Sequence, residues 1–387
     1  MTEALHPIQL GVGGIEIHGK ASRLAAAREA GLEYLCALGL DTYVVVTRHS
    51  GTGGSAIRFR LSEAFVHDWA PQCDTTQLCQ KLGLDTVGKI DDLDREILLS
   101  MLLSPVAFAY PGIDELESAV RIRRNIVLNG RKTALAFDTE EAERPEGLWT
   151  YSEETGFILL PGKPLIEALL AATQPEQTGR LYSFSCYRAT EYVMLLSIAQ
   201  EIARCNPKLL AQLQRQWETR AIMSGRFHDV FLKEYGSMTE PLPPRYYVPG
   251  DRLWFRNPDE ASSNAKGYEG SWVLYLGNGL FTNFWKRDLP FTLTSKCVEL
   301  YHWRHALYQD DQGQWQVDDG VVDERVRQTM ADRAEVRRIV DQMHRLRDPS
   351  GVYEQGGCID RTREHARYVR PGTSDIYLPD GGAVYKK

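Results

Sequence analysis

Cys186 stands where an extended segment gives way to a long helical one, in GRLYSFSCYRATEYVMLLSIAQEIA, residues 179–203. The aromatic residues just before it are typical of extended chain. From Tyr187 to Ala203 the sequence contains neither Gly nor Pro, which predicts a helix. The N-terminus of a helix lowers the pKa of a thiol and offers backbone N–H groups to an oxyanion. Position alone therefore leaves two interpretations open, a nucleophile or a small buried packing residue.

The bulk composition limits the kinds of partner that this chain can have. A length of 387 residues suggests two or three modules, and 43% hydrophobic residues suffice for a full core. A net charge of −7 disfavours nucleic acids and anionic membranes as general partners. No apolar run approaches the roughly 20 residues of a membrane span, and the first residues lack the pattern of a secretory signal peptide. We therefore expect a cytoplasmic protein, or one delivered without a cleaved signal, and leave the oligomeric state open.

The cysteines indicate reduced thiols without a metal site. They form an odd set with no CxxC spacing, and no His-x-His pair accompanies them, so neither a disulfide framework nor zinc is predicted. No cofactor is expected. Cys358 lies in GGCIDRT, where Arg361 follows too closely for a phosphate loop of the thiol-phosphatase type, so Cys358 is read as an ordinary small residue. The cysteines stand at positions 36, 73, 79, 186, 205, 297 and 358.

Three regions follow one another along the chain. Residues 1–90 read as an α/β appendage of unknown role, with a helix and then two strands joined by a hairpin at SGTGGS. Residues 91–306 alternate helices with strands and are expected to form the catalytic core. Residues 307–387 predict a polar loop and one helix with apolar residues from Val322 to Met343, then a Gly-rich irregular extension.

The second half of the core reads as antiparallel strands. A turn at Pro249-Gly250-Asp251 precedes a strand, and GNG at 277–279 predicts a tight hairpin between two further strands. A helix that starts with a cysteine and is followed by antiparallel strands is the plan of papain-like cysteine enzymes, whose base and orienting residue come from the strands. The predicted fold class is therefore α+β, with a papain-like core and additions at both ends.

Three phrases of the chain resemble the spore-coat type of bacterial protein-glutamine gamma-glutamyltransferase. They are LYSFSCYRATEYV, VPGDRLWFRNPD and GSWVLYLGNGLF, and they occur in the order found in that family. The stretch SPVAFAYPGIDELESAVRIRRNIV, residues 104–127, is similar to the N-terminal helical part of the family. The resemblance covers about residues 96–290.

The resemblance implies transamidation, with Cys186 as the nucleophile. The thiolate attacks a glutamine carboxamide of a protein substrate and ammonia leaves. A lysine amine then takes the acyl group to give an isopeptide crosslink, or water takes it in a deamidation. Protein substrates with accessible Gln and Lys are the implied partners, and sporulation is the usual context of the family.

The acid–base positions of the family carry other residues in this chain. Its glutamate in the second strand phrase falls on Ser271, its glutamate before the cysteine on Ser185, and its histidine on Phe284. Glu269 would share a face with Ser271 if it lies in regular strand, so we predict that Glu269 supplies the carboxylate. A solvated loop position is the other interpretation of Glu269. His228 is a rival base that would form a Cys–His pair, or else a structural histidine.

Three further titratable side chains are expected to be structural. Glu191 lies about 500° around the helix from Cys186 and points away from it. His302 and His305 are expected to pack with their aromatic neighbours.

The aromatic residues of the segment 245–285 are expected to form mainly a β-rich core. Trp272 and Trp285 are predicted to line a tunnel for the glutamine side chain, which would exclude water and favour transfer to an amine. The sequence therefore predicts thiol-dependent acyl transfer on protein glutamine. The alternative is a descendant with degraded chemistry that acts as a protein-binding module or a delivered effector, as the substituted acid–base positions suggest.

Overall fold

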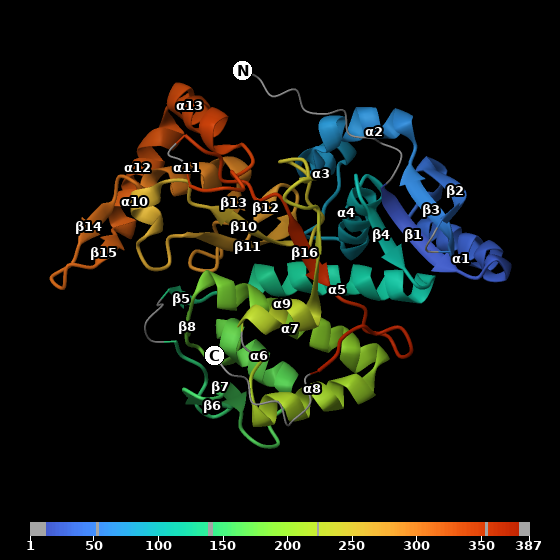
Figure 1. Ribbon diagram of the computed structural model, residues 1–387, viewed down its shortest axis with the longest axis horizontal. Helices are drawn as coiled ribbons and strands as arrows, with labels where there is room; N and C mark the ends of the chain where they lie inside the picture. Colours follow the sequence, from blue (N-terminus) through green and yellow to red (C-terminus); the bar gives the residue numbers. More distant parts are fainter. Residues whose placement is uncertain (1–12, 52–53, 138–141, 223, 353–354, 379–387) are drawn as a thin grey trace.

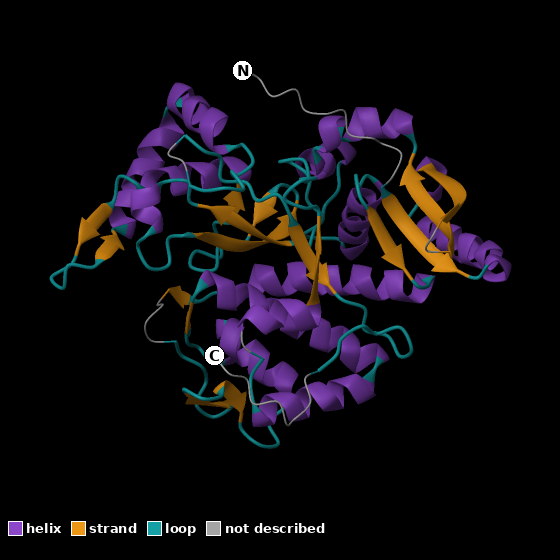
Figure 2. Cartoon of the chain, viewed as in Figure 1, coloured by secondary structure: helices purple, strands orange, loops and turns teal. Residues whose placement is uncertain are grey.

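The computed structural model describes residues 13–51, 54–137, 142–222, 224–352 and 355–378 (Figure 1). Two sheets and several helices lie around one long central helix, α5, which spans Ile113–Lys132. Figure 2 shows the larger sheet above this helix, the smaller sheet towards its right-hand end and further helices beneath it. The mixed architecture confirms the predicted α+β class. None of the helices that the structure describes is long and apolar enough to cross a membrane.

The smaller sheet joins the first part of the chain to a strand from beyond residue 90. Its strand order is β2-β3-β1-β4, with β1 antiparallel to β3 and parallel to β4. The predicted pairing of the two strands is confirmed, since β2 pairs with β3 from Val44–Leu61 to Gly51–Gly54, while Thr52 and Gly53 of SGTGGS lie outside the described residues. The expected domain boundary at residue 90 separates β1, β2 and β3 from β4, although β1 and β4 are neighbours in this one sheet. The strands are β1 Gly14–Gly19, β2 Val44–Gly51, β3 Gly54–Leu61 and β4 Ala107–Tyr110.

Four helices pack against or beside the smaller sheet. The apolar faces of β1 and β3 share one buried cluster with side chains from α1, α4 and α5, because alternate strand residues point to the same face. This part of the chain therefore has a core of its own that continues into the central helix. The helices are α1 Leu24–Ala37, α2 Glu63–Trp69, α3 Leu78–Leu82 and α4 Ile90–Leu102.

The larger sheet has the strand order β13-β12-β11-β10-β16-β9. The predicted tight turn at 277–279 is confirmed: it joins antiparallel β11 and β12, and all three of its residues have positive φ, which Gly and Asn tolerate best. The strands are β9 Leu232–Tyr235, β10 Arg252–Arg256, β11 Gly270–Gly277, β12 Leu280–Phe281, β13 Phe291–Thr292 and β16 Arg363–Ala366.

Strand β16 corrects the expectation that the end of the chain is irregular. It lies between β10 and β9, with Glu364 opposite both Arg252 and Glu234. The sequence Arg-Glu-His-Ala contains no β-branched or large apolar residue, so its composition does not indicate a strand. The C-terminal region thus contributes a strand to the larger sheet and is not only an addition to the core.

A bundle of helices covers one side of the central helix, and α7 is its most buried member. Its apolar residues share a cluster with α5, with neighbouring helices and with Leu274 of β11. A helix that is apolar on most of its surface is buried on most sides, and the polar residues that α7 buries, such as Glu191 and Glu201, are paired with arginines. The helices are α6 Leu165–Thr173, α7 Cys186–Cys205, α8 Pro207–Thr219 and α9 Ser224–Phe231.

Short strand pairs connect these helices to the rest of the molecule. Strand β5 is parallel to β8, with Phe137 opposite Phe184, and β6 is antiparallel to β7. The strands are β5 Ala136–Phe137, β6 Trp149–Ser152, β7 Gly156–Leu159 and β8 Ser183–Phe184.

A second helical group forms a third buried cluster with the larger sheet. The predicted single helix up to Met343 is two helices, because the Asp332 carboxylate accepts hydrogen bonds from the N–H groups of Ala334 and Glu335 and so starts a new helix. The elements are α10 Glu260–Ser263, α11 Leu293–Trp303, β14 Leu307–Gln309, β15 Trp315–Val317, α12 Asp319–Ala331 and α13 Arg333–Met343.

A buried ion pair fixes the central helix to the turn that precedes β10. Arg123 of α5 donates to Oδ1 of Asp251 at 2.8 Å, and the two side chains are 2% and 0% exposed. The other oxygen of Asp251 accepts from the hydroxyl of Tyr235 and from the N–H of Val248. Every oxygen of this carboxylate therefore has a partner, as a buried charge requires.

We expect Asp251→Ala to lower the free energy of unfolding by about 3–5 kcal/mol, since it leaves the Arg123 guanidinium buried without its counter-charge. Urea unfolding followed by circular dichroism measures the loss. The control is Glu143→Gln, which removes one partner of the exposed Arg180–Glu143 pair and should cost about 0–1 kcal/mol. Equal effects of the two substitutions would contradict this account.

Candidate active site

Cys186 is the first residue of α7, as the sequence predicts. The side chain of Ser185 caps the helix by accepting from the N–H of Arg188 at 3.3 Å, which fixes the turn between strand and helix. Before the turn, Phe184 pairs with Phe137 across β8 and β5. The thiol is therefore presented from a junction that is held on both sides.

The thiol of Cys186 lies between the start of α7 and the beginning of β11. The backbone N–H groups of Trp272 and Tyr187 donate to its sulfur. Burial nevertheless raises the pKa of Cys186 above its ordinary value, although these hydrogen bonds and the charges of Lys296 and Arg252 act to lower it. The expected net lowering of the pKa by the helix end is thus wrong for the free protein, because desolvation outweighs it.

A buried arginine of β10 connects the elements around the thiol. Nε of Arg252 donates to Oγ1 of Thr190 in α7 at 2.8 Å, and its guanidinium lies 3.9 Å from the ring centroid of Trp272 and 4.5 Å from that of Tyr187. It also forms an ion pair with Glu364 of β16. One side chain thereby joins α7, β11 and β16 beside Cys186.

His228 of α9 belongs to the same network through Glu364. Its Nδ1 lies 2.8 Å from Oε1 of Glu364, whose other oxygen binds Arg252. The hydrogen bond with Glu364 raises the pKa of His228, and burial opposes the shift. With 34% of its side chain exposed, His228 is a titratable group at the edge of the buried network.

Glu269 lies in a bend one residue before β11 and is exposed. Its backbone oxygen accepts from the N–H of Asn257 at 3.1 Å. The two-residue period of β11 begins at Gly270, so the condition under which Glu269 shares a face with Ser271 is not met. Ser271 itself is buried and stands opposite Phe255 of β10.

Aromatic side chains lie next to the cysteine segment in two groups. In the first, the ring of Trp272 stacks on that of Trp254 and meets that of Tyr187 edge-on, with centroids 6.0 and 5.2 Å apart. In the second, the ring centroid of Phe137 lies 5.1 Å from that of Trp285 and 6.2 Å from that of Tyr268. Trp272 adjoins Cys186 through its backbone N–H. Trp285 adjoins the cysteine segment only through Phe137.

The other acid–base candidates have partners elsewhere. Glu191 is buried in an ion pair with Arg188, and burial raises its pKa to about 7. His302 bonds to His305 and to Thr329. Phe284, at the position of the family's histidine, is buried in the helical core.

The sequence analysis did not single out Arg252, Glu364 and Lys296. Arg252 and Glu364 come together only when β16 enters the sheet, across 112 residues of sequence. Lys296 gave only a weak signal, since it is a charged residue three positions before Glu299 in the mixed stretch LTSKCVEL. Such Lys–Glu spacing is common on exposed helices, so it does not indicate a site.

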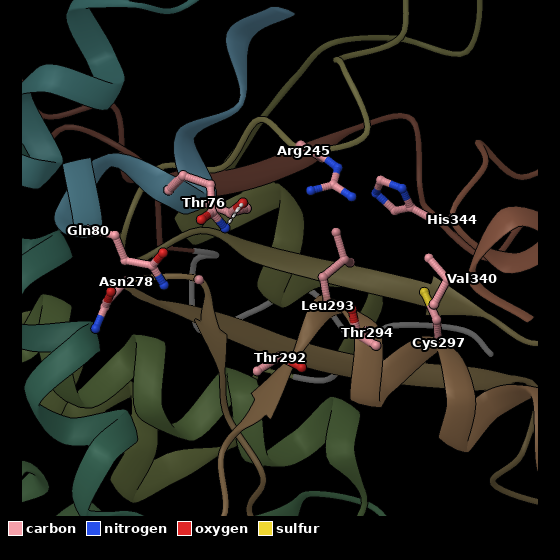
Figure 3. A pocket seen from close by; sticks show the side chains of 12 residues that line it. Thr76, Gln80, Arg245, Asn278, Thr292, Leu293, Thr294, Cys297, Val340 and His344 are labelled. Carbon is pink, nitrogen blue, oxygen red and sulfur yellow. Dashed lines mark hydrogen bonds between the residues drawn. The ribbon is translucent and has the colours of Figure 1, made fainter. Parts of the chain in front are cut away.

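A separate polar pocket lies between α3, the β11–β12 turn and the start of α11 (Figure 3). Figure 3 shows Arg245 and His344 side by side along its rim. Arg245 pairs with Asp74, and burial lowers the pKa of His344 to about 4. Cys297 lines this pocket and Cys186 does not. Among the described residues, no group of three His, Cys, Asp or Glu side chains is placed to hold a metal ion.

A helix that begins with a half-buried cysteine and packs on antiparallel strands defines an α+β core of the papain-like class. Comparison with known families is more specific: residues 72–377 match the protein-glutamine gamma-glutamyltransferase family. The chain therefore belongs to that family. The match extends beyond residues 96–290 and includes β16.

Among solved structures, the chain is similar to "Transglutaminase from Geobacillus stearothermophilus (without C-terminal extension)". The two are 18% identical, with a TM-score of 0.37, and the similarity covers 55% of this chain and 98% of that one. A comparison with curated proteins gave no match.

We expect the pKa of His228 to fall in Glu364→Gln, since the hydrogen bond with Glu364 is the largest cause of its raised value. NMR titration of the His228 ring measures both values. Glu234→Gln is the matched control, because Glu234 is exposed and acts on His228 only through space. A larger fall in the control would contradict the assigned hydrogen bond.

Proposed function

We propose that this protein transfers acyl groups from protein glutamine side chains through a thioester at Cys186. The sulfur attacks the carboxamide carbon, the C–N bond breaks and ammonia leaves with a proton. A lysine amine of a second protein then attacks the thioester to form an isopeptide bond, and the thiol is restored. The position of the Cys186 sulfur, between backbone N–H groups of α7 and β11, is the observation that carries the proposal.

These N–H groups are chemically suited to the reaction. Donors that are fixed before the reaction stabilise the charge that develops on sulfur and on the carbonyl oxygen, at no cost of reorganisation. In this site they come from two different elements, at Tyr187 and Trp272. The donor geometry is therefore set by how α7 packs on β11.

Water exclusion decides whether the thioester is transferred or hydrolysed. The two ring groups around Trp272 and Trp285 support crosslinking, since apolar walls disfavour the entry of water. Deamidation is the same first half-reaction followed by attack of water. It is therefore the product expected wherever the lysine acceptor does not reach the site.

Two residues are proposed as proton carriers, and their surroundings differ. The contact of His228 with Glu364 and its raised pKa support His228 as a protonated group in the network of the thiol. Glu269 is an exposed carboxylate at the entrance to β11 and has no comparable support. We therefore rank His228 above Glu269, which reverses the order that strand periodicity favours.

A second function follows from the altered acid–base positions. Ser271 and Phe284 cannot act as a general acid or base at neutral pH. This favours a protein that binds Gln-containing partners without turnover. This module would use the same aromatic surfaces. The cytoplasm, or delivery without a cleaved signal, remains the proposed location for either function.

Incubation with a fluorescent primary amine and a glutamine-rich protein should label that protein. Cys186→Ala should abolish labelling, because no thioester can form, while the melting temperature changes little. Gel fluorescence and release of ammonia measure the two halves of the reaction. Release of ammonia without labelling indicates deamidation. If the folded wild-type protein gives neither product, the result favours the binding module.

A pair of isosteric substitutions distinguishes the proton carriers. His228→Gln should lower kcat by about 10²–10⁴-fold if His228 moves protons in the transition state. Glu269→Gln should change kcat little, since the carboxylate is exposed in a bend. The amine-labelling rate measures both. The reverse pattern, with turnover lost only in Glu269→Gln, would restore the prediction from strand periodicity.

A further inference from the structure

Two buried cysteines from distant parts of the chain lie in contact. The sulfur of Cys297 in α11 is 3.6 Å from the sulfur of Cys358, and 61 residues of sequence separate the two. Both side chains are 0% exposed. Among the described residues, this is the only contact between cysteine sulfurs. The proposed acyl transfer uses neither thiol, so the pair is a reactive group without an assigned role.

The backbone holds both cysteines in place. The N–H of Cys358 donates to the carbonyl oxygen of Met343 at 2.9 Å, and the carbonyl oxygen of Cys358 accepts from the N–H of Arg256 at 2.8 Å. Cys297 lies in the second turn of α11. A disulfide has an S–S distance of about 2.05 Å, so the two sulfurs need to approach by about 1.5 Å. Rotation about the Cα–Cβ bonds moves a cysteine sulfur further than this, so the approach requires no displacement of the helix or the sheet.

The polar pocket described above leads to one of the two sulfurs. Cys297 lines this pocket, and Figure 3 shows its sulfur beside Val340. The volume of the pocket is about 140 Å³, whereas one water molecule needs about 10–15 Å³. The pocket therefore has room for a small oxidant but not for another protein. Cys358 does not line the pocket, so a small oxidant meets Cys297 first.

The surroundings of Cys358 suit it to the second step of an oxidation rather than the first. Burial raises the pKa of Cys358, and the neighbouring Cys297 raises it further. The thiolate is the form that attacks an oxidant, so a raised pKa disfavours Cys358 as the first site of reaction. A thiol in contact with a sulfenic acid is, however, placed to condense with it.

We propose that Cys297 and Cys358 are a site of reversible oxidation, where a hydroperoxide converts the two thiols to a disulfide. The Cys297 sulfur attacks the terminal oxygen of the peroxide and the O–O bond breaks. The thiol proton leaves on the other oxygen as an alcohol or water, and Cys297 becomes a sulfenic acid. The Cys358 sulfur then attacks the sulfenic sulfur, the S–O bond breaks, and hydroxide leaves as water with the proton of Cys358. The peroxide takes up the two electrons that the sulfurs lose.

The disulfide would join α11 to the segment that leads into β16. It closes a loop of about 60 residues, which restricts the unfolded chain and so favours the folded one. Disulfides inside cells are mostly transient and redox-sensing, and the buried pair fits that class. The inference concerns a second site and does not depend on the proposed acyl transfer.

The test treats the full chain with hydrogen peroxide, blocks the remaining thiols and maps the peptides by mass spectrometry without reduction. We expect one pair of peptides joined through Cys297 and Cys358, which separates on addition of dithiothreitol. The melting temperature of the oxidised protein should rise by about 5 °C. Free thiols at both positions, under conditions that oxidise the exposed Cys36, would overturn the inference.

Three variants test the order of the two steps. In Cys358→Ala the sulfenic acid of Cys297 has no partner, so dimedone should label Cys297, and the rise in melting temperature should be lost. In Cys297→Ala the remaining thiol of Cys358 should stay unreacted. Cys36→Ala is the control, because it removes an exposed thiol and should leave the joined peptides unchanged. Dimedone labelling of Cys358 in Cys297→Ala would overturn the assigned order.

Discussion

The Arg252 guanidinium is the interaction on which the arrangement around the thiol depends. A buried charge is tolerated only where its partners are fixed, and its partners come from α7, β11 and β16. The positions of these three elements are therefore coupled. A small displacement of any of them would leave the arginine or Glu364 unpaired, so the sheet and the cysteine helix are expected to move together as one body.

The chemistry of the site reflects a balance between burial and preorganised donors. Burial raises the pKa of the Cys186 thiol, although two backbone N–H groups and two cations act to lower it. A raised pKa slows the reaction of a thiol with oxidants, because the thiolate is the reactive form. In the proposed reaction, the same donors meet the negative charge that develops on sulfur and oxygen when a carboxamide enters. The site is thus protected at rest without losing the groups that the reaction requires.

Local sequence patterns predicted the elements that are determined by interactions between residues close in sequence. The start of α7 at Cys186, the hairpins and the tight turn follow from helix, strand and turn chemistry within a few residues. The signal failed where distant segments decide the outcome. Asp332 divided the last predicted helix by capping a new one, and Glu364 entered a strand that has no apolar pattern. Glu269 was chosen by a strand period that begins one residue after it.

The place of β16 has a consequence for the order in which the protein matures. Glu364, which joins Arg252 to His228, lies 112 and 136 residues after them in the sequence. Contacts of such separation form late, because a long loop must close first. During synthesis the cysteine helix leaves the ribosome well before β16. A nascent chain therefore carries Cys186 for some time without the finished network, so the proposed acyl transfer is expected only after β16 has joined the sheet.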